Sequence, residues 1–188
     1  IISNEKNLKK FNVDINEIKE ILKKYNISYD DDFISWHYHT FAGFKKIKQI
    51  DKILEIGTYD GRFTNYLSHI FPNSKITTID LPDEDSRFKD SYDRDSKSNL
   101  NKFLEKRKLN LKPENISFIS VDSNKINDLF KKKSFDLIWI DGDHLNPQVT
   151  KDINNSIDLL KDNGFLCCDD VYPYRKSSDP YINCDSYN

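Results

Sequence analysis

The 188-residue chain contains no methionine, only five glycines and three cysteines, and it has no excess of basic residues. Its 29 Lys and Arg residues are matched by 31 Asp and Glu residues, which leaves a formal net charge of −2. Proteins that bind nucleic acid through phosphate contacts normally carry a clear basic excess, so we expect no nucleic-acid partner. No apolar run in the sequence approaches the roughly 20 residues of a membrane span, so we expect no membrane partner either.

The start of the chain and its cysteines suggest where the protein resides. A chain without an initiator methionine is expected to be trimmed, and residues 1–6 show neither the apolar stretch nor the cleavage site of a signal peptide. The three cysteines (Cys167, Cys168 and Cys184) form no CxxC pair, which argues against structural zinc. Reduced thiols in a cytoplasmic protein are the expectation that follows.

The composition is polar but rich in aromatic residues. Mean hydropathy is −0.74 and only 37% of residues are hydrophobic, yet twelve Phe, ten Tyr and two Trp are present. Each of these side chains buries a large area, so the aromatic residues supply a core that the sequence otherwise lacks. The length fits one domain. We expect residues 1–44 to form an N-terminal helical cap and linker, and residues 45–188 to form the main domain.

Short apolar segments alternate with amphipathic ones from residue 51 onward. Alternation of strands and helices is typical of crossover units that build a parallel sheet. We therefore predict an α/β fold, a Rossmann-like, doubly wound and mostly parallel sheet with helices on both faces. The predicted strands span 52–56, 75–80, 116–122, 135–141 and 164–169, and the predicted helices span 61–71, 99–109, 124–132 and 147–162.

The remaining segments have less regular patterns. Residues 5–25 have helical periodicity, and residues 26–50 are predicted to form an irregular, partly helical linker. If His37 and His39 lie in an extended stretch they share one face, which suits a packed aromatic segment better than a metal site. Residues 81–97 mix both charge signs, which favours a solvated loop over the alternative, a flap above the site.

A carboxylate ends each of the five predicted strands. In a doubly wound sheet, ligands bind outside the carboxyl ends of the strands, at the point where the strand order reverses. These acids are therefore the first candidates for a ligand site. They are Glu55, Asp80, Asp122, Asp141 and Asp169.

The turn after the first predicted strand carries two glycines, Gly57 and Gly61, four residues apart. Gly57 lets a ligand approach the backbone, and Gly61 eases the turn into the helix. The spacing is neither that of the dinucleotide-binding GxGxxG motif nor that of a phosphate-binding loop. Glu55, two residues before the first glycine, would repel a phosphate but suits a cationic, amino-acid-like ligand.

The segment Ile53–Gly61, followed by Ile79-Asp80, Val121-Asp122 and Phe135–Asp141, resembles the class I S-adenosylmethionine-dependent methyltransferases over roughly residues 45–172. The resemblance implies that S-adenosylmethionine is the cofactor. It places the ribose hydroxyls on Asp80 and the adenine edge at Asp122 and Ser123, although Asp80 also suits a turn and Asp122 a helix N-cap. The other cofactor contacts that it implies are Glu55, Gly57, Thr58, Tyr59, Gly61 and Asp141.

A second part of the sequence is more specific. The segments Ile140–His144 and Cys168–Val171 resemble the divalent-metal-dependent O-methyltransferases that act on small molecules such as sugars and natural products. This resemblance implies Mg²⁺ held by Asp141, Asp169 and Asp170, a metal that prefers such oxygen ligands. It favours Asp143 as general base, with His144 as the alternative, and the expected acceptor is a hydroxyl of a sugar or phenolic compound.

Two further readings remain open at the level of sequence. One is a metal-independent methyltransferase of the same fold, and the other is a catalytically silent module that binds the cofactor or a partner. Trp36, Tyr38 and Phe41 are candidates for the acceptor pocket. Class I sheets normally have seven strands, and the 18 residues after Asp170 predict that the last strands are missing or reduced. The uncovered edge strand would need a cover, either from the C-terminal tail or from a partner chain, and the second option suits a homo-oligomer.

Overall fold

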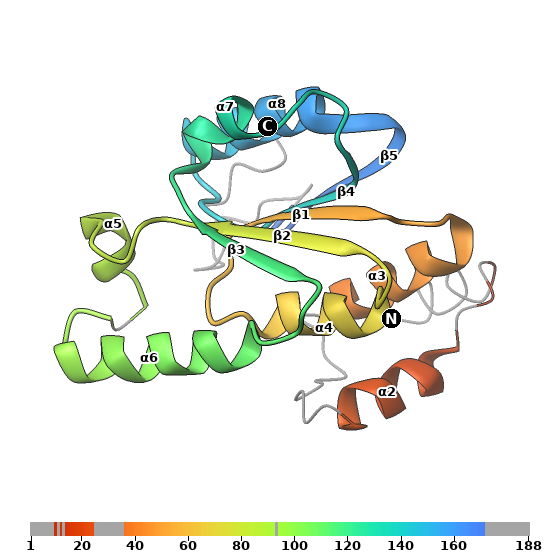
Figure 1. The fold of residues 1–188 in the computed structure, drawn as a ribbon, viewed down its shortest axis with the longest axis horizontal. Coiled ribbons are helices and arrows are strands. Elements are labelled where there is room, and N and C mark those ends of the chain that lie inside the picture. The colour runs from red at the N-terminus through yellow and green to blue at the C-terminus, as the bar shows by residue number, and fades with distance from the viewer. Residues whose placement is uncertain (1–9, 11, 13, 25–35, 93, 172–188) are drawn as a thin grey trace, which may run out of the picture.

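A five-stranded sheet of order β3-β2-β1-β4-β5 forms the centre of the computed structural model (Figure 1). The structure describes residues 10, 12, 14–24, 36–92 and 94–171. Every neighbouring pair of strands is parallel, so the predicted α/β class is confirmed. The strands are β1 (Lys52–Ile56), β2 (Lys75–Asp80), β3 (Ile116–Ser120), β4 (Phe135–Ile140) and β5 (Leu160–Cys168).

The strand order reverses between β1 and β4. The chain runs outward from β1 through β2 to β3, returns to β4 on the other side of β1, and then adds β5. The registers place Ile56 beside Ile79 on one side and beside Ile140 on the other. Because all strands are parallel, their carboxyl ends meet at one edge, and the reversal leaves a crevice there.

Helices cover both faces of the sheet, with α3 (Trp36–Ile47), α4 and α6 on one side and α7 and α8 on the other (Figure 1). Successive residues of a strand point to opposite faces, so Ile53 packs with Tyr66 and Leu67 while Leu54 packs with Ile126 in a second core. The helices after β1 are α4 (Arg62–Ile70), α5 (Ser86–Lys89), α6 (Lys97–Asn110), the 3₁₀ turn η2 (Ser123–Lys125), α7 (Ile126–Leu129) and α8 (Gln148–Leu159).

The N-terminal part is more regular than predicted. Its described helices are α2 (Ile15–Lys24) and α3 (Trp36–Ile47), and α3 replaces the second half of the predicted irregular linker. The extended geometry assumed for His37 and His39 is therefore wrong, since residues two apart do not share a helix face. The His37 ring instead lies 4.9 Å from the ring of Phe63, and His39 is buried.

The aromatic residues of α3 belong to the core. Phe41 is 1% exposed and contacts the Trp139 ring edge-on at 5.1 Å. The Tyr38 ring packs against Tyr66 at 4.6 Å. Neither side chain lines the cavity that is described below at the carboxyl edge of the sheet. The structure therefore gives Phe41 and Tyr38 a packing role in place of the expected acceptor pocket. As a helix, the segment turns its apolar side chains toward this face of the sheet and buries them there.

Several element boundaries differ from the predicted ones. β5 begins at Leu160, where that residue pairs with Phe135 before a register shift, so α8 ends earlier than predicted. Cys167 packs in one core and Cys168 in the other, and both are free thiols. Among the described residues, no helix has the length and apolar character needed to span a membrane. Cys184 and the predicted reduction of the last strands fall on residues 172–188, outside the described part.

Asp136 joins three strands at the amino-terminal edge of the sheet. It lies in β4, all six residues of which are buried, and is itself 4% exposed. Its Oδ2 accepts hydrogen bonds from the backbone N–H groups of Asp51 and Lys52, at 3.1 and 3.0 Å. Lys161 Nζ donates to both carboxylate oxygens at 2.9 Å. The carboxylate therefore satisfies two backbone donors and the partly exposed cation of Lys161 at once.

Asp136→Ala is expected to lower the free energy of unfolding by about 3 kcal/mol, because it leaves these donors and the cation without their acceptor. Urea denaturation monitored by circular dichroism measures the change. Asp162→Ala is the control, since that exposed side chain pairs with exposed Lys133 and should change stability by less than about 1 kcal/mol. Equal effects of the two substitutions would contradict the assigned role of Asp136.

Candidate functional site

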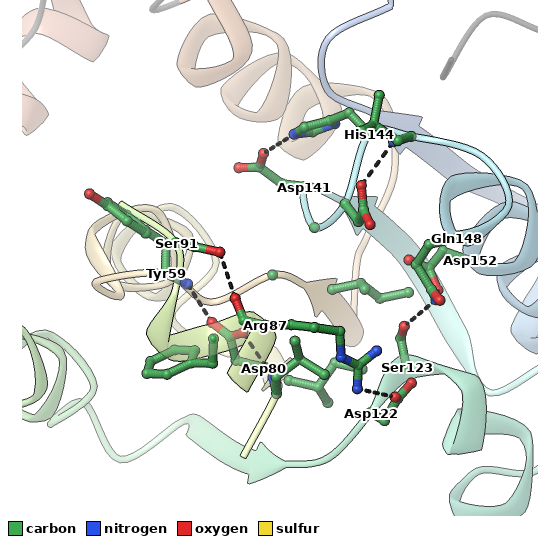
Figure 2. A pocket seen from close by; sticks show the side chains of 18 of the residues that line it. Tyr59, Asp80, Arg87, Ser91, Asp122, Ser123, Asp141, His144, Gln148 and Asp152 are labelled. Atoms are coloured by element: carbon green, nitrogen blue, oxygen red, sulfur yellow. Dashed lines mark hydrogen bonds and ion pairs between the residues drawn. The ribbon is translucent and has the colours of Figure 1, made fainter. Parts of the chain in front are cut away.

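A cavity of about 920 Å³ opens at the carboxyl edge of the sheet, where the strand order reverses (Figure 2). Residues that follow β1, β2, β3 and β4 all contribute to its wall. Its lining is strongly acidic, with six aspartates against two arginines. The aspartates are Asp80, Asp122, Asp141, Asp143, Asp152 and Asp169, and the arginines are Arg87 and Arg94.

Most of the residues predicted for the site do lie around this cavity, although their roles stay predictions. Four predicted residues do not line it: Glu55, Thr58, Gly61 and Asp170. Those that do are Gly57, Tyr59, Asp80, Asp122, Ser123, Asp141, Asp143, His144 and Asp169.

Gly57 lies in the cavity wall, at a position where a residue with a side chain would not fit. Its φ is +99°, and a Cβ at this position would lie 2.0 Å from the carbonyl oxygen of Asp141. Its N–H donates to Ile79 O at 2.9 Å, and the N–H of Asp141 donates to Ile56 O at 2.8 Å. The turn after β1 is thus held against the ends of both neighbouring strands, which only glycine permits.

Glu55 lies beneath this turn and does not reach the cavity. It is 1% exposed, and its Oε2 accepts hydrogen bonds from Thr64 Oγ1 and, at 2.5 Å, from Thr78 Oγ1. Thr58 joins the same group through the Thr78 hydroxyl, at 2.6 Å. Burial raises the pKa of Glu55 to about 7, although the two threonine hydrogen bonds oppose the shift. The structure therefore gives Glu55 a place under the turn, away from the cavity lining.

Asp80 combines a structural contact with a position in the cavity wall. Its Oδ2 accepts from the Tyr59 N–H at 2.9 Å and its Oδ1 from the Leu81 N–H at 2.8 Å. Burial raises the pKa of Asp80, while these two hydrogen bonds and the charges of Arg107 and Arg94 lower it. A carboxylate oxygen has two lone pairs, so each one retains acceptor capacity toward the cavity. Two neighbouring hydroxyl groups suit such an acceptor pair.

Asp122 adopts the N-cap role that the sequence left as an alternative. Its Oδ1 accepts from the backbone N and the side-chain Nδ2 of Asn124, at 2.9 and 2.6 Å. Its Oδ2 accepts from Arg87 Nη2 at 2.7 Å. Ser123, which follows it, accepts from Gln148 Nε2 at 2.9 Å. Asp122 therefore borders the cavity with its oxygens already engaged by the protein.

The segment at 81–97 forms a wall of the cavity, which corrects the preferred interpretation as a solvated loop. Phe88 on α5 is buried, and the guanidinium of Arg94 lies 3.9 Å from the centroid of its ring. Arg94 is only 6% exposed, and burial lowers its pKa while the charge of Asp80 opposes this. The cavity residues from this segment, which sequence reasoning did not single out, are Leu81, Arg87, Phe88, Ser91, Tyr92 and Arg94.

Carboxylates gather where β4 and β5 end. The side chains of Asp141 and Asp169 are hydrogen-bonded, and the pKa of Asp141 is raised well above its ordinary value, first by burial and then by the negative charge of Asp169. His144 Nε2 lies 3.7 Å from Asp141 Oδ1 and 3.8 Å from Asp170 Oδ2. Asp143 instead accepts from the Leu145 N–H at 2.9 Å. Asp170 therefore borders this cluster through His144, although it does not line the cavity.

The side chains of this cluster are of the kind that binds cations, but they are not arranged as a complete metal site. Among residues 10, 12, 14–24, 36–92 and 94–171, no group of three or more His, Cys, Asp or Glu side chains is arranged to hold a metal ion. Two carboxylates in contact, such as Asp141 and Asp169, are stabilised only by a shared proton or a bound cation. Carboxylate oxygens are also the ligands that Mg²⁺ prefers. The donor set therefore fits Mg²⁺ in chemistry.

The buried Glu55 predicts a pH-dependent loss of stability. At pH values below its ordinary pKa of 4.5, the residue is protonated in both the folded and the unfolded chain. As the pH rises toward 7 the unfolded chain ionises first, so the free energy of unfolding falls by roughly 3 kcal/mol over this range. Glu55→Gln removes this titration. The stability of the variant relative to the wild type is expected to rise by that amount between pH 4.5 and 8.

Urea denaturation of both proteins across this pH range measures the difference, since the titration of all other groups is common to them. A difference that stays constant with pH would show that Glu55 does not titrate between the folded and unfolded states as described.

A family model for a methyltransferase domain matches residues 54–171, well over half of the chain. No curated protein sequence matches the chain.

Among the solved structures that resemble the fold, two illustrate the likeness. One is described as a caffeoyl-CoA O-methyltransferase from Staphylococcus aureus; it is 16% identical, with a TM-score of 0.54, over 90% of this chain and 73% of that one. The other is the SAH-bound methyltransferase PaMTH1 of Podospora anserina, also 16% identical, with a TM-score of 0.53, over 85% of this chain and 69% of that one. At these identities the likeness concerns the fold.

Proposed function

The chain belongs to the methyltransferase family, as a class I S-adenosylmethionine-dependent enzyme, and from this premise we propose that it transfers the methyl group to a hydroxyl of a small molecule. The observation that carries the proposal is the 920 Å³ cavity at the strand reversal, with Asp80 on its wall and the Asp141–Asp169 carboxylates at its rim. The net charge of −2 argues for a free small molecule over a nucleic acid as the acceptor.

The cofactor is proposed to lie along the carboxyl edge of the sheet. Its methionine part would pass over Gly57, where the missing side chain leaves the backbone accessible. Its ribose hydroxyls would donate to Asp80, whose oxygens retain acceptor capacity. The adenine would then reach the end of the cavity formed by Asp122 and Ser123. The sulfonium would lie near the negative carboxylates of Asp141 and Asp169, which favours the cationic donor.

The reaction needs a nucleophilic oxygen aligned with the methyl group. A bond forms between the acceptor oxygen and the methyl carbon while the sulfur–methyl bond breaks, which leaves neutral S-adenosylhomocysteine, and the hydroxyl proton passes to a base. Asp143 and His144 both line the cavity and are the proposed bases. The geometry favours His144, because its Nε2 faces the carboxylate cluster while Asp143 accepts from a backbone N–H of its own turn.

Mg²⁺ is proposed to assist, held by Asp141, Asp169 and Asp170. When bound, the ion would lower the pKa of the acceptor hydroxyl. The hydrogen-bonded contact between Asp141 and Asp169 supports this proposal, since a cation would relieve the repulsion between their charges.

A metal-independent methyltransferase of the same fold is the second candidate. It is favoured by one observation, that the described residues contain no group of three ligand side chains arranged around a metal position. In that case Asp169 and Asp170 shape the cavity, and His144 removes the proton unaided.

Methyl transfer to a panel of hydroxylated acceptors, with and without EDTA, separates these candidates. EDTA is expected to lower the rate about 100-fold, and added Mg²⁺ should restore it. Asp141→Asn and Asp169→Asn should each lower kcat by a similar factor, because each removes a negatively charged ligand. Lys132→Ala is the control and should leave the rate unchanged, since Lys132 pairs with Asp158 on the surface.

Full activity of Asp141→Asn in the presence of EDTA would contradict the metal proposal and leave the metal-independent enzyme. In that case His144→Ala and Asp143→Asn distinguish the two proposed bases, because loss of the true base should lower kcat by at least 100-fold.

A further inference from the structure

The acid expected at the adenine edge is already occupied by the protein. Asp122 accepts two hydrogen bonds from Asn124 and one from Arg87, all between 2.6 and 2.9 Å. Arg87 is held in place by Asp85, which accepts from its Nη2 at 2.7 Å and its Nε at 3.0 Å. An incoming amino group would therefore compete with charged and backbone donors for Asp122. Another acceptor at this end of the cavity is needed to recognise the base.

Asp152 on α8 supplies a second carboxylate at the same end. It lines the cavity although it is only 1% exposed. Its Oδ1 accepts from Gln148 Nε2 at 2.8 Å, and the same nitrogen donates to Ser123 Oγ, next to Asp122 in sequence. Figure 2 shows the three side chains together, away from Asp141 and His144. Ser123 also hydrogen-bonds Asp152 through its side chain. A carboxylate with these two partners still has lone pairs that can accept a hydrogen bond from a donor in the cavity.

The hydrogen bonds around Asp152 fix what it can offer. Gln148 Oε1 accepts from Asn124 Nδ2 at 3.1 Å, so the orientation of the amide is set and its Nε2 faces Asp152. An ionised carboxylate can only accept hydrogen bonds. Ile79 and Val121 line the same cavity and present apolar surface to a flat ring. This end of the cavity thus suits a planar heterocycle that carries an amino group on its edge.

We infer that Asp152, oriented by Gln148 and Ser123, accepts a hydrogen bond from the exocyclic amino group of adenine and makes the site selective for adenine over 6-oxopurines. The inference rests on the proposed function, because it requires S-adenosylmethionine in this cavity. A 6-oxopurine presents a carbonyl oxygen at the same position, which would face the buried carboxylate without a proton between them. A ligand with this mismatch binds much more weakly, because the buried polar groups of the site are left without their partners.

Calorimetry with S-adenosylhomocysteine and with S-inosylhomocysteine, in which oxygen replaces the amino group, tests the inference. The wild type is expected to bind the adenosyl compound at least about 100-fold more tightly. Asp152→Asn should reduce this ratio to below about tenfold, because the amide can turn its N–H toward the carbonyl. Gln148→Leu should lower the ratio less, and it serves as the second variant if Asp152→Asn does not fold.

Two controls separate the roles of the acids. Asp158→Asn alters an exposed residue on the same helix and should leave both affinities unchanged. Asp122→Asn should weaken both compounds by a similar factor, since it releases Arg87, and should preserve the ratio.

Similar affinities of the wild type for the two compounds would overturn the inference. So would a ratio preserved in Asp152→Asn, or one lost in Asp122→Asn instead. Failure of the wild type to bind S-adenosylhomocysteine at all would overturn the proposed function, which keeps the two conclusions distinguishable.

Discussion

The close approach of Gly57 to the carbonyl oxygen of Asp141 is the contact on which the rest of the site depends. β1 and β4 are neighbours at the reversal of the strand order, and their following turns must pass each other at the same edge. A residue with a side chain at position 57 would collide with the backbone after β4. Since that backbone leads directly into Asp143 and His144, the same glycine opens the cavity and positions the carboxylate cluster at its rim.

A site built from so many carboxylates opposes the stability of the fold that carries it. Burial raises the pKa of Glu55, Asp80, Asp141 and Asp152, which means that each ionised group is less favourable in the folded chain than in water. Asp136, at the opposite edge of the sheet, has the reverse role, because its charge is matched by Lys161 and two backbone donors. The unmatched charges are concentrated at the functional edge, as expected where a cationic ligand supplies the missing partner.

The sheet and much of the cavity could be predicted because they depend on local patterns. Apolar runs marked the strands, and a parallel arrangement then brings Asp80, Asp122 and Asp141 to one edge. The extent of α3 was not predicted, since the segment was expected to be only partly helical, and its aromatic residues are placed by packing against the sheet, as Phe41 is against Trp139. This packing partner lies about a hundred residues away in the sequence, and no local pattern reveals it.

Residues brought together by long-range contacts were also missed. Arg87 seemed to belong to a solvated, charged loop until the structure placed its guanidinium on Asp122. Gln148 and Asp152 fall in the predicted helix 147–162 and were not singled out from the sequence. The position of α8 beside η2 brings them to Ser123. One local signal was available, since Phe88 is an apolar residue within a charged run and therefore indicates a buried anchor.

A crystal structure of the chain with S-adenosylhomocysteine tests the central claim most directly, that the cavity at the strand reversal is the cofactor site. The account predicts the compound across the carboxyl ends of β1, β2 and β4, with its homocysteine part over Gly57 and its ribose hydroxyls within hydrogen-bond distance of Asp80. Electron density for the compound elsewhere on the molecule, or a ribose that makes no contact with Asp80, would contradict it.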